Sequence, residues 1–303
     1  SVLIRKKHEK TFSKVKKNNG LYPNILKQNS DQLFFRSNNV VLKEDLILPK
    51  DTILNISPGT KITLDSGVSI ISYGSIIAKG KKDKNIIISP LNIHKPWGTI
   101  AIVGQGYNTN SNNIFENCIF DGGSGANRRG AYFSGMLSAH YVNEINIKNC
   151  VFQNSRSENG GDDSINVKYG KVVITDTSFV NNVGDGIDFD FVDNNSAIIN
   201  SNFVDNKNDA IDISSSNVFI KNCRINNSGD KGISAGEKSK IKLRNCEIYN
   251  SKFGVASKDS SLVKIRDSMI LNNIIGIGLY NKKEYYQNPS IRVTNSKIED
   301  NFI

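Results

Sequence analysis

Acidic side chains are concentrated in three short segments of an otherwise basic chain. The segments DSINVK (163–168), DGIDFD (185–190) and DAIDIS (209–214) each begin with aspartate and then alternate between apolar and polar residues. Carboxylates that lie close together raise one another's pKa values unless something compensates their charge. Paired carboxyl groups also carry out acid–base hydrolysis of glycosidic bonds. The sequence therefore indicates acid–base or metal chemistry in these segments.

The sequence leaves open three means of compensating this acidity. Several carboxylate oxygens together can hold a calcium ion. The candidate calcium ligands are Asp185, Asp188, Asp190 and Asp212. Alternatively, the acids pair with the nearby lysines Lys168, Lys231 and Lys238. The third alternative is that the carboxylates accept hydrogen bonds from turn N–H groups, because aspartate is a favoured turn residue.

The candidate catalytic groups are the aspartates that begin the three segments, two nearby lysines and one histidine. They are Asp163, Asp185, Asp209, Lys168, Lys231 and His140. The glycine-rich segment 120–141 precedes the first acidic segment and is expected to be an insertion loop that flanks or covers the same face. Its arginines and tyrosines, together with one downstream lysine, are the candidate substrate-binding residues: Arg128, Arg129, Tyr132, Tyr141 and Lys238.

A short motif recurs along the chain and sets the positions of these segments. Its clearest copies are FENCIF (115–120), IKNCVF (147–152), IKNCRI (220–225) and LRNCEI (243–248). Over eight copies, the last apolar residues are 32, 27, 24, 22, 23, 22 and 28 residues apart. A period near 22–24 residues with longer outliers indicates a solenoid with loop insertions. Each repeat carries two short alternating runs, which predict strands and not helices.

The four cysteines occupy one position of this repeat, and none has the spacing of a metal site. They are Cys118, Cys150, Cys223 and Cys246. We expect free thiols that pack inward as small apolar groups, in preference to disulfides. The asparagine before each cysteine is expected to belong to an asparagine ladder at a turn.

Stacking the repeats in register assigns a place to each aspartate. One apolar column must face the core: Ile165, Ile187, Ile211, Ile233, Val255 and Ile277. Because side chains alternate along a strand, Asp188, Asp190 and Asp212 are expected on an outer face, in columns whose successive members lie about 4.8 Å apart. Asp185 is expected at the turn that enters the strand, and none of these aspartates is expected to be buried. They occupy only three or four coils, which favours a site over a general feature of the scaffold.

The alternation, the Asn-Cys motifs and the segment DLILPKDTILNISPGTKITLDSGVSIISYGSIIAKG (45–80) together resemble right-handed parallel β-helix proteins of the pectin-lyase-like superfamily. The resemblance implies an all-β fold, a single-stranded right-handed parallel β-helix (a solenoid) with coils of about 22–24 residues. We expect this β-helix over residues 31–303, with its N-terminal coils in 31–95. Residues 1–30 are expected to form a basic arm or linker.

The resemblance to the polygalacturonases of that superfamily is incomplete. Those enzymes carry NTD, GDD, GHG and RIK motifs on successive coils. NDAIDISSSNVFIKNC (208–223) is similar to the first of these coils, but the next coil reads GDK, with Lys231 in place of the second acid. GGDDSINVK (160–168) resembles the GDD coil, but the coil after it reads GDG and lacks the histidine. Polygalacturonase activity is therefore not predicted.

Related β-helix lyases imply a second reaction, in which a cation neutralises the carboxylate of a uronic acid and a lysine or arginine acts as the base. By this resemblance, the aspartates would hold Ca²⁺, and Lys168 or Lys231 would be the base. We therefore expect a polysaccharide-active protein that acts on a uronate-containing glycan, as a lyase or a glycosidase-like enzyme, through its Asp/Lys-lined outer face. The alternative is a non-catalytic carbohydrate-binding or surface solenoid with a structural role.

The net charge of +10 favours a polyanionic partner, and an acidic polysaccharide is the one expected. Nucleic acid is not expected, because an acidic face would repel phosphates. No apolar run approaches the length of a membrane span. The fold resemblance implies an extracytoplasmic protein, whether secreted, periplasmic or at the cell surface. No signal in the sequence sets an oligomeric state.

Overall fold

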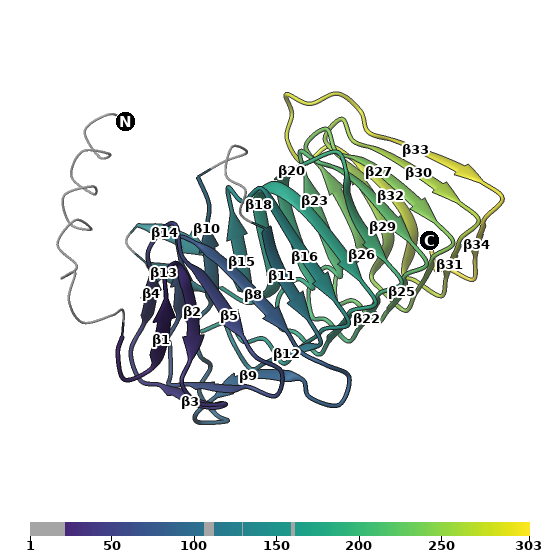
Figure 1. Ribbon diagram of the computed structural model, residues 1–303. Helices are drawn as coiled ribbons and strands as arrows, with labels where there is room; N and C mark the ends of the chain where they lie inside the picture. Colours follow the sequence, from purple (N-terminus) through teal and green to yellow (C-terminus); the bar gives the residue numbers. More distant parts are fainter. Residues whose placement is uncertain (1–21, 106–111, 129, 159–160) are drawn as a thin grey trace.

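The computed structural model describes residues 22–105, 112–128, 130–158 and 161–303. Every regular element in these residues is a β-strand. The strands wind into a solenoid with three faces, and on each face the strands of successive coils pair in parallel (Figure 1). The described residues include no helix that is long and apolar enough to cross a membrane. The all-β parallel solenoid predicted from the repeat is confirmed.

The first face is built from ten strands. They are β4 (Leu46–Leu48), β7 (Ile70–Ser72), β10 (Ile100–Val103), β15 (Gly135–His140), β18 (Asp163–Thr175), β20 (Ile187–Val192), β23 (Ile211–Ser214), β26 (Lys231–Gly236), β29 (Phe253–Lys258) and β32 (Ile275–Tyr280). The long strand β18 continues into the second face and so joins the two faces into one 21-stranded sheet.

The second face holds the other strands of that sheet. They are β1 (Leu26–Asn29), β2 (Gln32–Phe35), β5 (Ile53–Ile56), β8 (Ser75–Lys79), β11 (Asn112–Glu116), β16 (Glu144–Lys148), β21 (Ser196–Ile199), β24 (Asn217–Lys221), β27 (Lys240–Arg244), β30 (Leu262–Arg266) and β33 (Ser290–Thr294).

The third face is an 11-stranded parallel sheet. Its strands are β3 (Asn39–Leu42), β6 (Lys61–Leu64), β9 (Ile86–Pro90), β12 (Cys118–Asp121), β17 (Val151–Gln153), β19 (Ser178–Val180), β22 (Asn202–Val204), β25 (Arg224–Asn226), β28 (Glu247–Tyr249), β31 (Met269–Leu271) and β34 (Lys297–Glu299). A separate hairpin pairs β13 (Ala126–Arg128) with β14 (Ala131–Phe133).

The core is a set of columns that run along the solenoid axis. The predicted column from Ile165 to Ile277 is in register through five successive strand pairings, and all its members are buried except Ile277, which is partly buried. On the third face, four buried phenylalanine rings stack nearly parallel, with centroids 4.4, 5.3 and 4.6 Å apart. They are Phe120, Phe152, Phe179 and Phe203. The interior is therefore filled layer by layer, one side chain of each column per coil.

The inward thiols are confirmed, and the asparagine ladder is confirmed at the two later cysteines. Asn200, Asn222 and Asn245 adopt left-handed backbone conformations with φ between 51° and 54°. The Asn245 Nδ2 group donates to Asn222 Oδ1 at 2.8 Å, and Asn222 Nδ2 donates to Asn200 Oδ1 at 2.9 Å. Before the first cysteine, Asn117 Nδ2 instead donates to the Gly80 carbonyl. All four cysteines are free and buried, and the Cys223 N–H donates to Cys246 Sγ at 3.4 Å.

Two predicted boundaries differ in the structure. Residues 1–21 of the expected arm lie outside the described residues, but residues 22–30 include β1, which pairs antiparallel with β2 and buries Leu26. Regular β-structure is therefore already present before residue 31. Within the expected insertion 120–141, the last residues form β15, a regular strand of the first face. β15 belongs to the coil because its alternate side chains Leu137 and Ala139 are buried in the core.

Candidate functional site on the first face

The first face carries the acidic residues, in the register that stacking of the repeats predicts. Asp188 lies opposite Asn166 on one side and Asp212 on the other. In the neighbouring outward column, Asp190 lies opposite Lys168. Adjacent members of a column are about one strand spacing, 4.8 Å, apart. The outward aspartates Asp188, Asp190 and Asp212 are half-buried and form one group across β20 and β23.

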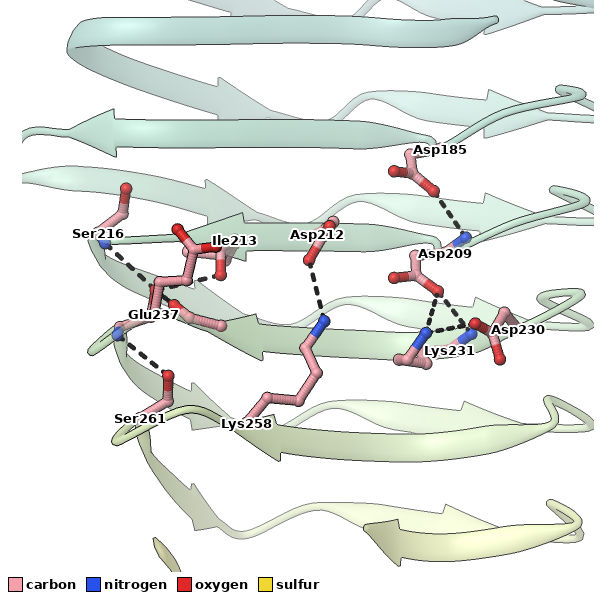
Figure 2. Close-up of polar contacts among 12 residues, drawn as sticks. Asp185, Asp209, Asp212, Ile213, Ser216, Asp230, Lys231, Glu237, Lys258 and Ser261 are labelled. Carbon is pink, nitrogen blue, oxygen red and sulfur yellow. Dashed lines mark hydrogen bonds and ion pairs between the residues drawn. The ribbon is translucent and has the colours of Figure 1, made fainter. Parts of the chain in front are cut away.

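A second acidic column stands where the strands begin. The Asp185 N–H donates to Asp163 Oδ1 at 3.0 Å, and the Asp209 N–H donates to Asp185 Oδ1 at 2.8 Å. Asp209 Oδ1 in turn accepts the Lys231 N–H at 2.9 Å. Figure 2 shows this contact pattern from Asp185 to Lys231. Backbone hydrogen bonds, one of the three predicted alternatives, therefore compensate this column.

The expectation that Asp185 is not buried is wrong, because its side chain accepts a hydrogen bond from the next turn and is only 8% exposed as a residue. Asp163 and Asp209 are likewise buried. Burial raises the pKa of Asp163 to about 7 and that of Asp209 to about 6. Burial, followed by the charges of Asp163 and Asp209, also raises the pKa of Asp185 well above its ordinary value. These carboxyls therefore favour the protonated form more than exposed ones do.

The raised pKa values predict that the protein loses stability as the pH rises from near 3.8 to about 7. In this range the folded state keeps a proton on Asp163 that the unfolded chain has released, so the stabilisation is complete below the unfolded pKa and is lost as pH rises through the folded pKa. The Asp163→Asn variant, which can still accept the Asp185 N–H, is expected to show a flatter dependence of Tm on pH. Melting curves of both proteins between pH 4 and about 8 measure this. Equal slopes for the two proteins would contradict the assignment.

A chain of side-chain hydrogen bonds crosses the outward column. Asn166 Nδ2 donates to Asp188 Oδ2 at 2.7 Å. This orientation turns Asn166 Oδ1 towards His140, whose Nε2–H donates to it at 2.6 Å. His140 is buried and packs against Phe133 of the hairpin, and burial lowers its pKa. The predicted acid–base residue His140 thus holds Asn166, which in turn holds the Asp188 carboxyl.

Of the three outward aspartates, Asp188 is the one with a clearly raised pKa. Burial raises the pKa of Asp188 well above its ordinary value, and the carboxyls of Asp163, Asp190 and Asp212 raise it further. The Lys168 ammonium acts in the opposite direction. A carboxyl that retains its proton near neutral pH can donate that proton in acid catalysis.

Lysines compensate the other two outward aspartates. Lys168 Nζ lies 3.0 Å from Asp190 Oδ2, which is the pairing expected as the second alternative. Lys258 Nζ lies 3.9 Å from Asp212 Oδ1, as Figure 2 shows. Lys258 reaches Asp212 across Gly236, where a side chain would meet the Lys258 stem at 3.6 Å. The Lys258 ammonium is therefore a buried cation of the face that the sequence did not single out.

Lys231 ends the acidic column that stands where the strands begin. Its Nζ lies 3.3 Å from Asp209 Oδ1 and also contacts Asp230. Burial acts to lower the pKa of Lys231, but Asp209 and Asp230 outweigh it and the net shift is upward. Burial raises the pKa of Tyr280, which Lys231 lowers and the nearby acids raise. Lys231 is thus held as a cation, and Tyr280 stands beside it.

Comparisons with known proteins agree with this architecture. The family described as a right handed beta helix region matches residues 165–303. A crystal structure of a variant of the periplasmic alginate epimerase AlgG superposes with a TM-score of 0.54 at 12% identity, over 93% of this chain and 74% of that chain. A second AlgG structure gives a TM-score of 0.52 at 12% identity, over 94% and 75% of the two chains. The protein is a right-handed parallel β-helix.

A mannuronic acid specific polysaccharide family 6 lyase from human gut microbiota also matches this β-helix, with a TM-score of 0.35 at 10% identity over 83% of each chain. No curated protein matches the chain. The identities are low, so the likeness is one of fold. At that level, the right-handed parallel β-helix fold that the sequence predicts is confirmed.

The predicted substrate-binding residues do not all meet on the acidic face of the β-helix. Tyr132, on β14, is close enough to this face for its acids to act on it. Burial raises the pKa of Tyr132, and the carboxyls of Asp163 and Asp162 raise that pKa further. Arg128 instead binds Asp45 at 2.7 Å and so fixes the hairpin to the first coils. Lys238 lies in the turn after β26, 5.8 Å from the centre of the Tyr286 ring.

The remaining two candidates are Arg129 and Tyr141. Arg129 lies outside the described residues. Tyr141 directly follows His140 at the end of β15, and half of its surface is exposed. Tyr132 and Tyr141 are therefore the members of the predicted substrate-binding set that border the acidic columns.

The arrangement of the acids does not fit a calcium site. The described residues contain no group of three or more aspartate, glutamate, histidine or cysteine side chains placed to hold a metal ion. Of the four predicted ligands, Asp190 pairs with Lys168, Asp212 with Lys258, and Asp185 with a backbone N–H. Calcium needs six to eight oxygen ligands around one point. We therefore derive no step of the reaction through calcium.

The face combines a carboxyl with a raised pKa, paired carboxylates and three lysines on an open sheet. A separate cleft of about 590 Å³ opens elsewhere, beside His94, Arg156 and Lys207, and includes none of the residues of the two acidic columns. The open sheet suits a long polymer better than a small enclosed ligand, because small-molecule sites are usually deep and mostly apolar.

Proposed function

We propose that this β-helix acts on an acidic, uronate-containing polysaccharide as a lyase or glycosidase-like enzyme, through the Asp/Lys face of β18, β20, β23, β26 and β29. The observation that carries the proposal is the half-buried Asp188 carboxyl. Its pKa is raised well above the ordinary value by burial and by three neighbouring acids. Such a carboxyl can protonate the oxygen of a departing sugar, a step that both reactions require.

The neighbouring groups suit the rest of the chemistry. Lys168 and Lys258 each pair with a single carboxylate, and an incoming uronate could accept a further hydrogen bond from each ammonium. In a lyase, this contact would neutralise the uronate carboxylate and make its neighbouring C–H acidic enough for a base to remove. In a hydrolase, Asp190 or Asp212 would supply the second carboxyl, since adjacent columns provide the separation that such pairs need.

Two further observations support a uronate polymer as the substrate. The net charge of +10 attracts polyanions. The superposed epimerase is described as acting on alginate, an acidic polysaccharide, and as periplasmic. A location outside the cytoplasm, which is where such polymers are found, is part of this proposal.

The proposal is tested by incubating the protein with alginate, polygalacturonate, hyaluronan and a neutral glucan, with and without a calcium chelator. We expect cleavage of at least one uronate polymer. Ultraviolet absorbance of unsaturated uronate ends identifies a lyase, whereas new reducing ends without that absorbance identify a hydrolase. Unchanged cleavage in the chelator is expected, because the acids are compensated by lysines and backbone N–H groups. Cleavage of the neutral glucan alone would overturn the acidic substrate.

A non-catalytic binding solenoid is the second candidate, and one observation favours it. Most carboxylates on the face already have partners, as a stable surface for display would require. Retention of a uronate polymer without any cleavage product would select this function over the enzymatic one.

A further inference from the structure

Three aromatic side chains form an exposed stack along the edge of the first face. The rings of Tyr141 and Tyr169 are 4.8 Å apart and 9° from parallel, and the rings of Tyr169 and Phe191 are 4.9 Å apart and 3° from parallel. Tyr141 is 50% exposed and Phe191 is 44% exposed. We call these three residues the aromatic strip. Each one follows directly after a member of the outward column that contains His140, Lys168 and Asp190.

The turn does not require an aromatic residue at this position. All three residues of the strip have left-handed backbone conformations, with φ between 55° and 57°, which bulky side chains rarely adopt. The same position of later coils holds Ser215, Glu237 and Asp259, with φ of 52°, 57° and 50°. Polar residues thus occupy this turn elsewhere, and the strip keeps large aromatic rings there at a cost in backbone energy. Unfavourable, exposed residues confined to a few coils indicate a function.

Among the residues that the structure describes, the two neighbours of the strip along its column are a glycine and a serine. The residue before Tyr141 in the column is Gly104, whose N–H donates to His140 O at 2.8 Å and which has no side chain to cover the ring. The residue after Phe191 is Ser215, whose side chain is small and bonded to the Glu237 carbonyl. A flat ligand can therefore stack on either end of the strip without displacing another ring.

A hollow continues the strip towards the N-terminus. It has a volume of about 280 Å³ and is lined by Gly74, Gly104, Asp31 and Asp51, among others. Gly104 lies against the backbone of Tyr141, since a side chain on Gly104 would meet the Tyr141 carbonyl oxygen at 2.0 Å. The hollow has the size of about one sugar ring and adjoins the strip through Gly104, and its two carboxylates can accept hydrogen bonds from hydroxyl groups.

We infer that the aromatic strip and the adjoining hollow form a sugar-binding subsite that holds the glycan chain alongside the charged face. The occupant is a pyranose ring, whose C–H face packs on an exposed aromatic ring while its hydroxyls reach the carboxylates of the hollow. This inference rests on the proposed function for the identity of the chain, but it assigns different residues and a different force. Stacking on the strip does not depend on charge, whereas lysine contacts to uronates do.

The test compares Tyr141→Asn and Phe191→Asn with the matched control Ser215→Asn, at the same turn position one coil further on. Retention is measured by electrophoresis in gels that contain alginate, polygalacturonate or hyaluronan, at low and at high salt. Each strip variant is expected to bind about two- to tenfold more weakly, by the same factor at both salt concentrations. The control should bind as the wild type does. Because asparagine suits a left-handed turn, the strip variants are expected to melt no lower than the wild type.

The variant Lys168→Ala separates this inference from the proposed function. Strip variants that bind normally, beside a Lys168→Ala variant that does not, would overturn the subsite and leave the proposed function standing. Weaker binding by the strip variants, in a protein that cleaves none of the three polymers, would support the subsite and overturn the enzymatic proposal. Failure of the wild type to be retained by any of the three polymers would overturn both.

Discussion

Replacing Asp188 by asparagine is expected to lower the rate of glycan cleavage by about 10²- to 10⁴-fold, the range that a positioned general acid contributes. The asparagine side chain has nearly the same shape and can still accept the hydrogen bond from Asn166 through its carbonyl oxygen. It cannot give up a proton to the leaving oxygen. The loss is therefore expected in kcat, with little change in KM or in Tm. Initial rates on the uronate polymer that the wild type cleaves, with melting curves of both proteins, measure this.

The matched control for this variant is Asp205→Asn. Asp205 lies in a turn ladder and accepts a hydrogen bond from Asn227 at 2.6 Å, and the corresponding turn position of neighbouring coils already holds asparagine. This control removes one carboxyl from the protein but not from the first face, so its activity is expected to equal that of the wild type. A normal rate for Asp188→Asn would show that Asp188 is not the acid. The remaining carboxyls with raised pKa values would then be those of the column where the strands begin, such as Asp163.

The pH profile distinguishes an acid role for Asp188 from a merely structural one. Because the pKa of Asp188 is raised, cleavage should decline as the pH rises through that value and the proton is lost. In the Asp188→Asn variant, the residual activity should no longer show this decline. A variant that only loosened the sheet would lower activity at every pH and would leave the shape of the profile unchanged.

The sequence predicts the columns because their physical cause is periodic. Side chains alternate along a strand, and parallel coils repeat every 22 or 24 residues, so that Ile165, Ile187 and Ile211 must align. The same argument places Asp188 and Asp190 outward, next to Asn166 and Lys168. The asparagine ladder follows from one turn residue per coil. These features depend on local pattern alone, and the structure has them in the predicted register.

The sequence could not predict contacts that cross from one coil to another by a long side chain. Lys258 reaches Asp212 two coils away, and the length and direction of that side chain cannot be read from the repeat. Asp185 is buried because the turn of the next coil covers it, and alternation along one strand says nothing of that turn. Tyr280 stands in the column of Lys168 and Asp190, but in a coil where the acidic pattern has ended. Only its position in the repeat, in line with Lys168 and Asp190, indicates that Tyr280 belongs to this face.

The aromatic strip was missed for a related reason. Only Tyr141 belongs to the glycine-rich segment that predicts substrate binding, whereas Tyr169 and Phe191 directly follow strand segments whose lysine and aspartates are the stronger sequence signal. Their common feature is the turn position after the sixth residue of the strand. Identifying it requires the end of each strand, and strand boundaries are the least certain part of reading a sequence.

Replacing Phe179 by alanine is expected to reduce the free energy of unfolding by about 3–5 kcal/mol, the cost of removing a large buried ring. Phe179 is fully buried, and its ring lies between Phe152 at 5.3 Å and Phe203 at 4.6 Å. The loss includes both the transfer of the ring from the core and the cavity between two rings that cannot close on each other, because their separation is set by the strand spacing. Urea unfolding followed by circular dichroism measures the change.

Phe191→Ala makes the same chemical change in the exposed aromatic strip and is the matched control. Its ring has one stacked neighbour and is 44% exposed, so the expected cost is about 1 kcal/mol or less. The difference between the two variants should also appear in the shape of the transition. Each coil of a solenoid is stabilised mainly by its neighbours, so a cavity in the central coils weakens the coupling between the two halves. Phe179→Ala is therefore expected to broaden the unfolding transition, and equal costs with equally sharp transitions would show that the inner stack does not couple the coils.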